Sequence, residues 1–130
     1  MKTLYFKKGE EIVCEGTLSD CAYIVVSGTV EVSKKANENK KRVIGILKDN
    51  DIFGEMGLID GLPRSATVTA LEDCSINKLS KESFESLIER NPEALMPILK
   101  ILSSRLRSTL NMVDELQLRV DKGGAAAGSR

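Results

Sequence analysis

The spacing of apolar residues changes once along this chain of 130 residues, and the change divides the sequence into two kinds of structure. Between Tyr5 and Leu79, apolar residues alternate with polar ones or form short β-branched runs between turns, which is typical of short β-strands. From Ser80 onward, apolar residues recur every three or four positions, as on one face of an α-helix. This order predicts a small β barrel or sandwich followed by helices, all within one domain.

Polar or glycine-containing segments separate the expected strands. Ser27-Gly28 closes the first strand, and the polar segment 37–41 marks the tip of a hairpin between the second and third. Glu72 and Asp73 separate the last two. Five strands are expected, at residues 22–26, 29–33, 42–47, 66–71 and 75–79.

Two helices are expected after the strands. Ser80 is suited to cap the first helix, with Glu82 in a first turn where the helix dipole favours an anion. Pro92 is suited to the first position of the second helix. The apolar stripe from Leu95 to Val120 belongs to one long helix, bent or restarted at Pro97. The expected domain spans residues 1–122, with strands over about 4–79, helices over about 81–120, and a linker or added tail at 123–130.

Composition excludes several classes of function. The 19 basic and 19 acidic residues balance, so no basic surplus indicates a nucleic-acid or anionic-membrane partner. No apolar run is long enough to span a bilayer, and no signal-peptide core follows Met1. A cytoplasmic protein without a membrane segment is expected.

The chemistry-bearing residue types also argue against an enzyme or a metal protein. Histidine is absent, which removes the commonest general base and the commonest transition-metal ligand. Cys14, Cys21 and Cys74 are odd in number and form no C-x-x-C pair, so buried free thiols are expected rather than a disulfide framework or an iron–sulfur sensor. No nucleophile–base constellation or paired carboxylate motif is present. The sequence predicts a binding protein with no metal and no cofactor.

Residues 53–68 carry the most informative chemistry. Gly54 and Gly57 allow the backbone to approach a ligand closely, and a short helical turn after Gly54 would aim free N–H groups at an anion. Arg64 stands at the entry to an expected strand and offers a cationic fork that suits phosphate oxygens. Glu55 can accept hydrogen bonds from a sugar hydroxyl. These groups fit a ribose phosphate, although the same pattern also fits an ordinary turn with two surface charges.

The same segment resembles the phosphate-binding cassette of cyclic-nucleotide-binding domains. That family includes the regulatory subunits of cyclic-AMP-dependent kinase, the catabolite activator protein and cyclic-nucleotide-gated channels. Its pattern is F-G-E, two small or apolar residues, L, a turn, then P-R-[AST]-A-x-V, and residues 53–68 match every fixed place. The resemblance covers about residues 4–118, including a strand and turn at 6–16 and a hairpin at 23–32.

The resemblance implies a fold and a mechanism. The implied fold is mainly β with C-terminal helices: a β-roll of the jelly-roll (double-stranded β-helix) type, with a short phosphate-binding helix and a long C-terminal helix. The implied function is to bind a cyclic nucleotide and, through movement of the C-terminal helix, to signal to an effector domain or partner that the nucleotide is bound. Such movement requires that the ligand bind one arrangement better than the other.

The resemblance also implies roles for single residues. Arg64 would pair with the exocyclic phosphate, and Glu55 would hold the ribose 2′-hydroxyl. The phosphate cradle would be completed by backbone N–H groups and one hydroxyl, from Gly54, Met56, Gly57, Ser65 and Ala66. The base pocket would be lined by Val43, Ile44 and Leu47.

A lid over the base is expected from the long helix, at Arg107, Leu110, Asn111 and Asp114. Asp114 could accept from a purine amino group, and Arg107 could stack on the ring. The apolar stripe of this helix could instead pack on the β-roll or on a twin helix in a homodimer. In that alternative, the polar residues are solvated.

The chain departs from the family pattern in three places. Asn50 stands where glycine is usual, and Asn tolerates the left-handed backbone that such a place requires. Only about three residues precede the opening strand, so a minimal domain or an excised piece is expected. No helix-turn-helix follows the long helix, so no nucleic acid is expected to be read by this chain itself.

Several functional alternatives remain open at this stage. In this family, Thr at the position of Ser65 tends to accompany guanine and Ala tends to accompany adenine, and Ser is intermediate between the two in character. Cyclic AMP is favoured over cyclic GMP. The main rival is a vestigial β-roll that binds no nucleotide and acts in dimerisation or docking. The effector, whether transcription factor, channel or kinase, is not specified by the sequence.

Overall fold

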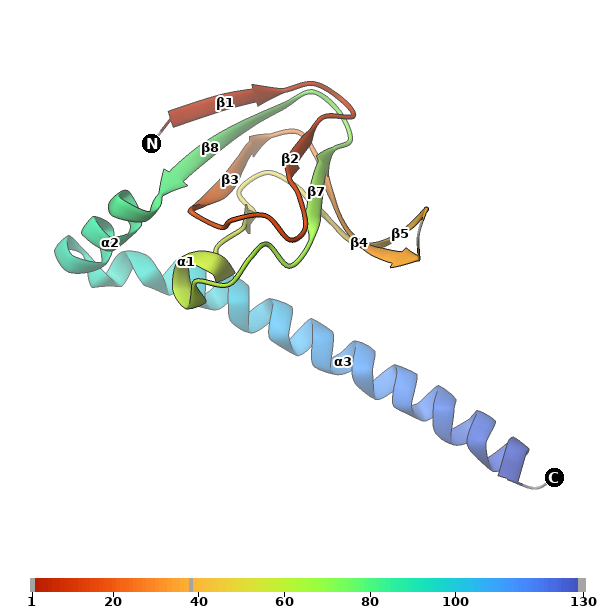
Figure 1. Cartoon of the computed structure of the whole chain (residues 1–130). Helices are drawn as coiled ribbons and strands as arrows, with labels where there is room; N and C mark the ends of the chain where they lie inside the picture. The colour runs from red at the N-terminus through yellow and green to blue at the C-terminus, as the bar shows by residue number, and fades with distance from the viewer. Residues whose placement is uncertain (1, 38, 129–130) are drawn as a thin grey trace. The chain divides into compact units, whose positions relative to one another are not determined.

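The computed structural model describes residues 2–37 and 39–128, and the chain falls into two compact units. The first unit ends at Pro92 and the second begins at Glu93. The first unit is built of two antiparallel four-stranded sheets (Figure 1). In sheet order, the first contains β1 (Lys2–Phe6), β8 (Cys74–Ser80), β3 (Cys21–Ser27) and β6 (Ile52–Phe53). The second contains β2 (Glu11–Val13), β7 (Thr67–Ala70), β4 (Val30–Asn37) and β5 (Lys40–Leu47).

This arrangement confirms the β-roll expected from the sequence. All five predicted strands are present as β3, β4, β5, β7 and β8. The predicted hairpin joins β4 to β5, and the register places Val30 opposite Leu47. The two-residue strand β6 was not predicted, because two residues are too short to show an alternation.

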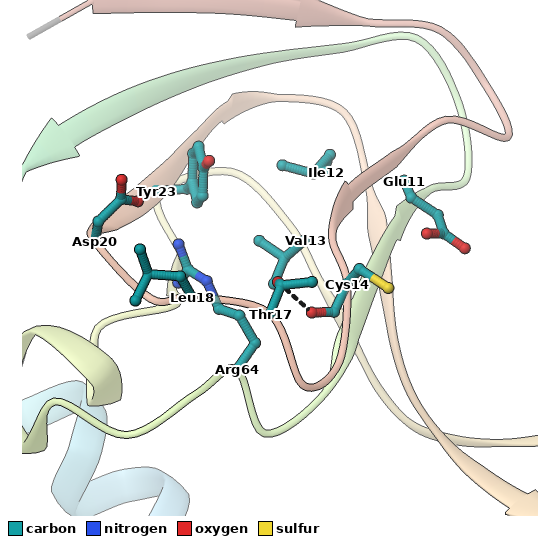
Figure 2. A pocket seen from close by; sticks show the side chains of 9 residues that line it. All are labelled: Glu11, Ile12, Val13, Cys14, Thr17, Leu18, Asp20, Tyr23 and Arg64. Carbon is teal, nitrogen blue, oxygen red and sulfur yellow. Dashed lines mark hydrogen bonds between the residues drawn. The ribbon is translucent and has the colours of Figure 1, made fainter.

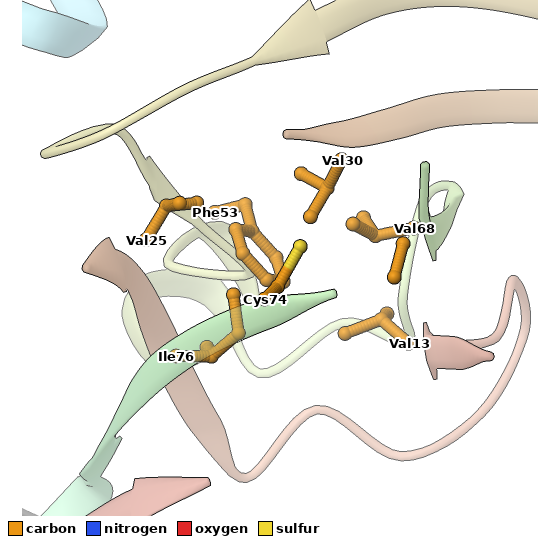
Figure 3. Close-up of a cluster of buried hydrophobic side chains, with 8 residues drawn as sticks. Val13, Val25, Val30, Phe53, Val68, Cys74 and Ile76 are labelled. Atoms are coloured by element: carbon orange, nitrogen blue, oxygen red, sulfur yellow. The ribbon is translucent and has the colours of Figure 1, made fainter. Parts of the chain in front are cut away.

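One apolar core fills the space between the sheets (Figure 3). The alternation is clearest in β7, where Val68 and Ala70 point inward, and in β8, where Ile76 is completely buried. Burial of a valine or isoleucine side chain such as Val68 or Ile76 stabilises the fold by roughly 1.5–3 kcal/mol relative to leaving it exposed. The buried cluster consists of Val13, Val25, Val30, Phe53, Val68, Ala70, Cys74 and Ile76.

Two helices belong to the first unit. The short α1 (Met56–Asp60) ends at Gly61, whose φ of 72° is the left-handed conformation that stops a helix. The predicted cap of α2 (Lys81–Arg90) is confirmed, because the Ser80 side chain accepts a hydrogen bond of 3.1 Å from the Ser83 N–H.

The long helix begins differently from the prediction. Pro92 starts a 3₁₀ turn, η1 (Pro92–Ala94), rather than the α-helix itself. Helix α3 (Leu95–Gly128) then runs without a restart at Pro97, which lies in its first turn. The first N–H groups of a helix have no intrahelical partner, so a proline there removes no bond.

The tail expected as a linker is helical over residues 123–128, and residues 129–130 lie outside the described part. Among the helices that the structure describes, none has both the length and the apolar character needed to cross a membrane.

Candidate functional site

The motif segment runs from the end of β6, through α1, to the start of β7. Gly54 directly follows the buried Phe53, and its φ of 78° lies in the left-handed region that favours glycine. At Asn50, φ is 71°, which confirms that Asn replaces glycine at a left-handed position. The backbone bends before and after α1 therefore depend on residues that tolerate this conformation.

Arg64 is the central residue of the site. Only 7% of it is exposed, although it carries a full positive charge. Its Nη1 donates to the Gly54 carbonyl at 2.9 Å, and its Nη2 donates to Cys21 Sγ at 3.4 Å. Within residues 2–37 and 39–128, no carboxylate lies at ion-pair distance from it. A buried cation without a carboxylate partner is expected to attract an anionic ligand.

The guanidinium of Arg64 lines a cavity of about 290 Å³. Figure 2 shows the arginine side chain extending toward Tyr23, with Asp20 nearby. The guanidinium carbon lies 5.6 Å from the centroid of the Tyr23 ring, within the range of a cation–π contact. The other residues around the cavity are Glu11, Ile12, Val13, Cys14, Thr17 and Leu18.

The loop between β2 and β3 fixes the backbone of this arginine. Arg64 N–H donates to the Thr17 carbonyl at 2.9 Å, and the Arg64 carbonyl accepts from Gly16 N–H at 2.8 Å. The same loop packs against α1, because a Cβ atom at Gly57 would overlap the side chain of Ser19. Residues 38 to 48 positions apart in sequence thus hold the segment in place.

Glu55 lies immediately before α1 and is 2% exposed. Its carbonyl accepts a hydrogen bond of 3.1 Å from Leu58 N–H, which closes the first turn. A carboxylate in such a buried place is expected to need donors. The structure thus places the predicted acid inside the motif rather than on the surface, which excludes the alternative of two exposed surface charges.

The remaining predicted residues of the motif differ in exposure. Met56 and Ser65 are exposed, while Gly54, Gly57 and Ala66 are partly buried. Their roles toward a ligand stay predictions.

The predicted base-pocket residues also differ. Leu47 packs against the core, but Val43 and Ile44 are about half exposed on β5. The predicted lid residues all lie on α3, in the second unit, and are exposed: Arg107, Leu110, Asn111 and Asp114. Their placement over a base stays a prediction.

The structure adds neighbours of Arg64 that the sequence did not single out, chiefly Tyr23 and Cys21. Both point to the same face of β3, because strand residues two apart share a face, and this two-residue spacing was the signal available in the sequence. Burial of the phenol, with its hydrogen bond to the Cys21 thiol, raises the pKa of Tyr23 to about 12. The phenol is therefore neutral at physiological pH.

The cysteine prediction was wrong for one residue of three. All three thiols are free, and Cys21 and Cys74 are buried as expected. Cys14 is exposed, because it follows the last residue of β2 and begins the loop at the cavity.

Comparison with known proteins agrees with the geometry. The model of the cyclic nucleotide-binding domain family matches residues 3–91. The cAMP-activated global transcriptional regulator CRP of Haemophilus influenzae is 39% identical over 95 residues, covering 72% of this chain and 42% of that protein. The chain spans about half the length of the curated relatives it matches.

Two solved structures extend the comparison. The crystal structure of Thermus thermophilus catabolite activator protein has a TM-score of 0.81 and 30% identity, covering 89% of this chain and 55% of that one. The regulatory domain of Toxoplasma gondii PKA, crystallised with cAMP, has a TM-score of 0.67 and 29% identity. The match covers 82% of this chain and 39% of that one. With the motif, the β-roll and the family match in agreement, the chain belongs to the cyclic nucleotide-binding domain family.

Proposed function

We propose that this chain binds a cyclic nucleotide, cyclic AMP in preference to cyclic GMP, and has no catalytic activity of its own. The observation that carries the proposal is the buried Arg64, which lines a cavity and has no carboxylate at ion-pair distance in the described part of the chain. The relatives named as cAMP-activated regulators support cyclic AMP. A related EAL enzyme, solved in cAMP-bound and cGMP-bound forms, keeps cyclic GMP as the second candidate.

In this proposal the phosphate is held by Arg64 and the ribose 2′-hydroxyl by Glu55. Hydrogen bonds to charged groups contribute about 1.5–3 kcal/mol each, whereas micromolar affinity corresponds to about 8 kcal/mol. These two side chains therefore supply a large share, and burial of the purine supplies the rest. The half-exposed apolar residues Val43 and Ile44, with Leu47, are available to cover the base.

The other contacts of the proposed cradle come from Gly54, Met56, Gly57, Ser65 and Ala66. Ser65 is exposed two residues before β7, next to the buried arginine, so its hydroxyl is accessible to a phosphate oxygen. A Cβ atom at Gly54 would overlap Arg64, and one at Gly57 would overlap Ser19, so these two positions hold the cradle together only as glycines.

The role of Glu55 predicts discrimination at the sugar. 2′-Deoxy cyclic AMP should bind about 10- to 100-fold more weakly than cyclic AMP, because the buried carboxylate loses a charge-assisted donor. Competition against a fluorescent cyclic nucleotide measures both affinities. Glu55→Gln should reduce the discrimination, whereas Glu89→Gln, at an exposed position on α2, should preserve it. Equal affinities for the two ligands in the wild-type protein would argue against this role.

We further propose that α3 reports occupancy to an effector domain or partner. The base lid would consist of Arg107, Leu110, Asn111 and Asp114, and the apolar stripe would pair with a second copy of the helix. Leu106, Leu110 and Val113 are more than half exposed, and a continuous exposed apolar stripe is typical of an interface. Closure of the lid requires that the nucleotide bind the protein with the lid closed more tightly than the protein with the lid open.

The proposal for α3 makes two predictions, one about hydrogen exchange at its amide groups and one about the oligomeric mass of the protein. Saturating cyclic AMP should slow hydrogen exchange along α3, because lid closure shields the helix. Sedimentation equilibrium should give a dimer mass for the wild type and a monomer mass for Leu110→Glu, with Ser108→Glu as the matched control at an exposed position of α3. A monomeric wild type, or exchange unaffected by the nucleotide, would rule out the corresponding half of the proposal.

A further inference from the structure

The guanidinium of Arg64 is held on several sides by this chain's own groups. Gly54 O and Cys21 Sγ accept from its two terminal nitrogens, at 2.9 Å and 3.4 Å. The Tyr23 ring lies 5.6 Å from the guanidinium carbon. A long arginine side chain has many rotamers, so fixing its tip requires contacts of this kind.

Tyr23 is itself fixed on the strands. It lies opposite Phe53 in the antiparallel pairing of β3 with β6. The two rings stack with centroids 5.2 Å apart and an interplanar angle of 20°, and Phe53 is only 3% exposed. Phe53 also directly precedes Gly54, whose carbonyl accepts from Arg64. The aromatic pair thus joins the core to both the glycine and the arginine of the site.

We propose that Tyr23 is a positioning residue for the phosphate-binding arginine: its ring face orders the Arg64 guanidinium so that its remaining N–H donors are aimed into the cavity. The proposal rests on the proposed function. The aromatic face, rather than the hydroxyl, is the active part, because the guanidinium carbon of Arg64 lies over the ring, 5.6 Å from its centroid. The phenol stays neutral at physiological pH, so it adds no negative charge that would compete with a phosphate.

The test compares nucleotide affinities in the full chain. Tyr23→Leu, which removes the aromatic face but keeps an apolar side chain, should raise the Kd for cyclic AMP by about 2- to 30-fold. Tyr23→Phe keeps the face and should restore binding to within about 3-fold of the wild type. Tyr5→Leu is the matched control, since Tyr5 lies on β1 and is 78% exposed. Thermal unfolding of each variant shows whether it is folded at the titration temperature.

A double-mutant cycle separates positioning from general packing. If Tyr23 acts through the guanidinium, Tyr23→Leu should cost less than about 2-fold in a background that already carries Arg64→Lys. An equal cost in both backgrounds would mean that Tyr23 acts on the fold rather than on Arg64, and would overturn the proposal. Unchanged affinity in Tyr23→Leu would do the same.

A nucleotide-free measurement keeps this proposal distinct from the proposed function. In the NMR spectrum of the free protein, the Arg64 Nε–H resonance should be shifted by the Tyr23 ring current, and the shift should vanish in Tyr23→Leu while surviving in Tyr5→Leu. A resonance insensitive to Tyr23→Leu overturns the positioning role. If the shift is present but the wild type binds neither cyclic AMP nor cyclic GMP, the proposed function fails while the ordering of Arg64 by Tyr23 stands.

Discussion

Replacing Arg64 with alanine is expected to weaken cyclic AMP binding by about 100-fold or more, because two or more charge-assisted hydrogen bonds to the phosphate disappear together. The variant should remain folded. The wild-type arginine is buried without a carboxylate partner in the described part of the chain, so its removal leaves no buried carboxylate unpaired. We expect the free energy of unfolding to change by about 2 kcal/mol or less, the net of lost hydrogen bonds and relieved desolvation.

The measurement is a titration of Arg64→Ala with cyclic AMP alongside chemical unfolding of the same preparation. Arg42→Ala is the matched control, because Arg42 lies on the exposed part of β5 and belongs to neither the motif nor the cavity. It should bind as the wild type does. A folded Arg64→Ala variant with unchanged affinity would show that the phosphate is held elsewhere.

The second large effect is expected at Gly54. A Cβ atom at this position would overlap Nη1 of Arg64, and the backbone φ of 78° is one that alanine adopts with strain. Because the overlapping atom is the end of a flexible side chain, the guanidinium can move aside and the fold can survive. Gly54→Ala should therefore lose about 1–2 kcal/mol of unfolding free energy from the strain and bind cyclic AMP at least about 10-fold more weakly.

Gly9→Ala separates backbone strain from displacement of the arginine. Gly9 has a φ of 92°, but a Cβ there would meet no atom within 4 Å. This variant should show a similar loss of stability with unchanged affinity. Displacement of Arg64 would be refuted as the cause of weaker cyclic AMP binding by either of two results. Gly54→Ala could retain wild-type affinity, or Gly9→Ala could lose as much affinity as Gly54→Ala.

The sequence predicted those features that are local along the chain. The motif at residues 53–68 is contiguous, and the alternation in β7 and β8 and the cap at Ser80 are likewise properties of neighbouring residues. A restart at Pro97, one of the two alternatives predicted, does not occur, and the sequence could not show this because a proline in a first helical turn and one at a restart have the same local pattern.

The surroundings of Arg64 could not be predicted in the same way. Cys21 and Arg64 are 43 positions apart, and the pairing of Thr17 with the Arg64 backbone likewise joins distant segments. Such contacts follow from how the two sheets close on each other. The exposed Cys14 has the same origin, since its burial depends on where β2 ends rather than on its residue type.

The most direct test is a calorimetric titration of the wild-type protein, stripped of carried-over ligand, with cyclic AMP and then with cyclic GMP. We predict near-stoichiometric binding of cyclic AMP at micromolar affinity or tighter, with cyclic GMP weaker. Titrations at two temperatures exclude a binding enthalpy that happens to be zero at one of them. Folded, ligand-free protein that gives no heat with either nucleotide at both temperatures would contradict the proposal and favour a β-roll that serves only in docking or dimerisation.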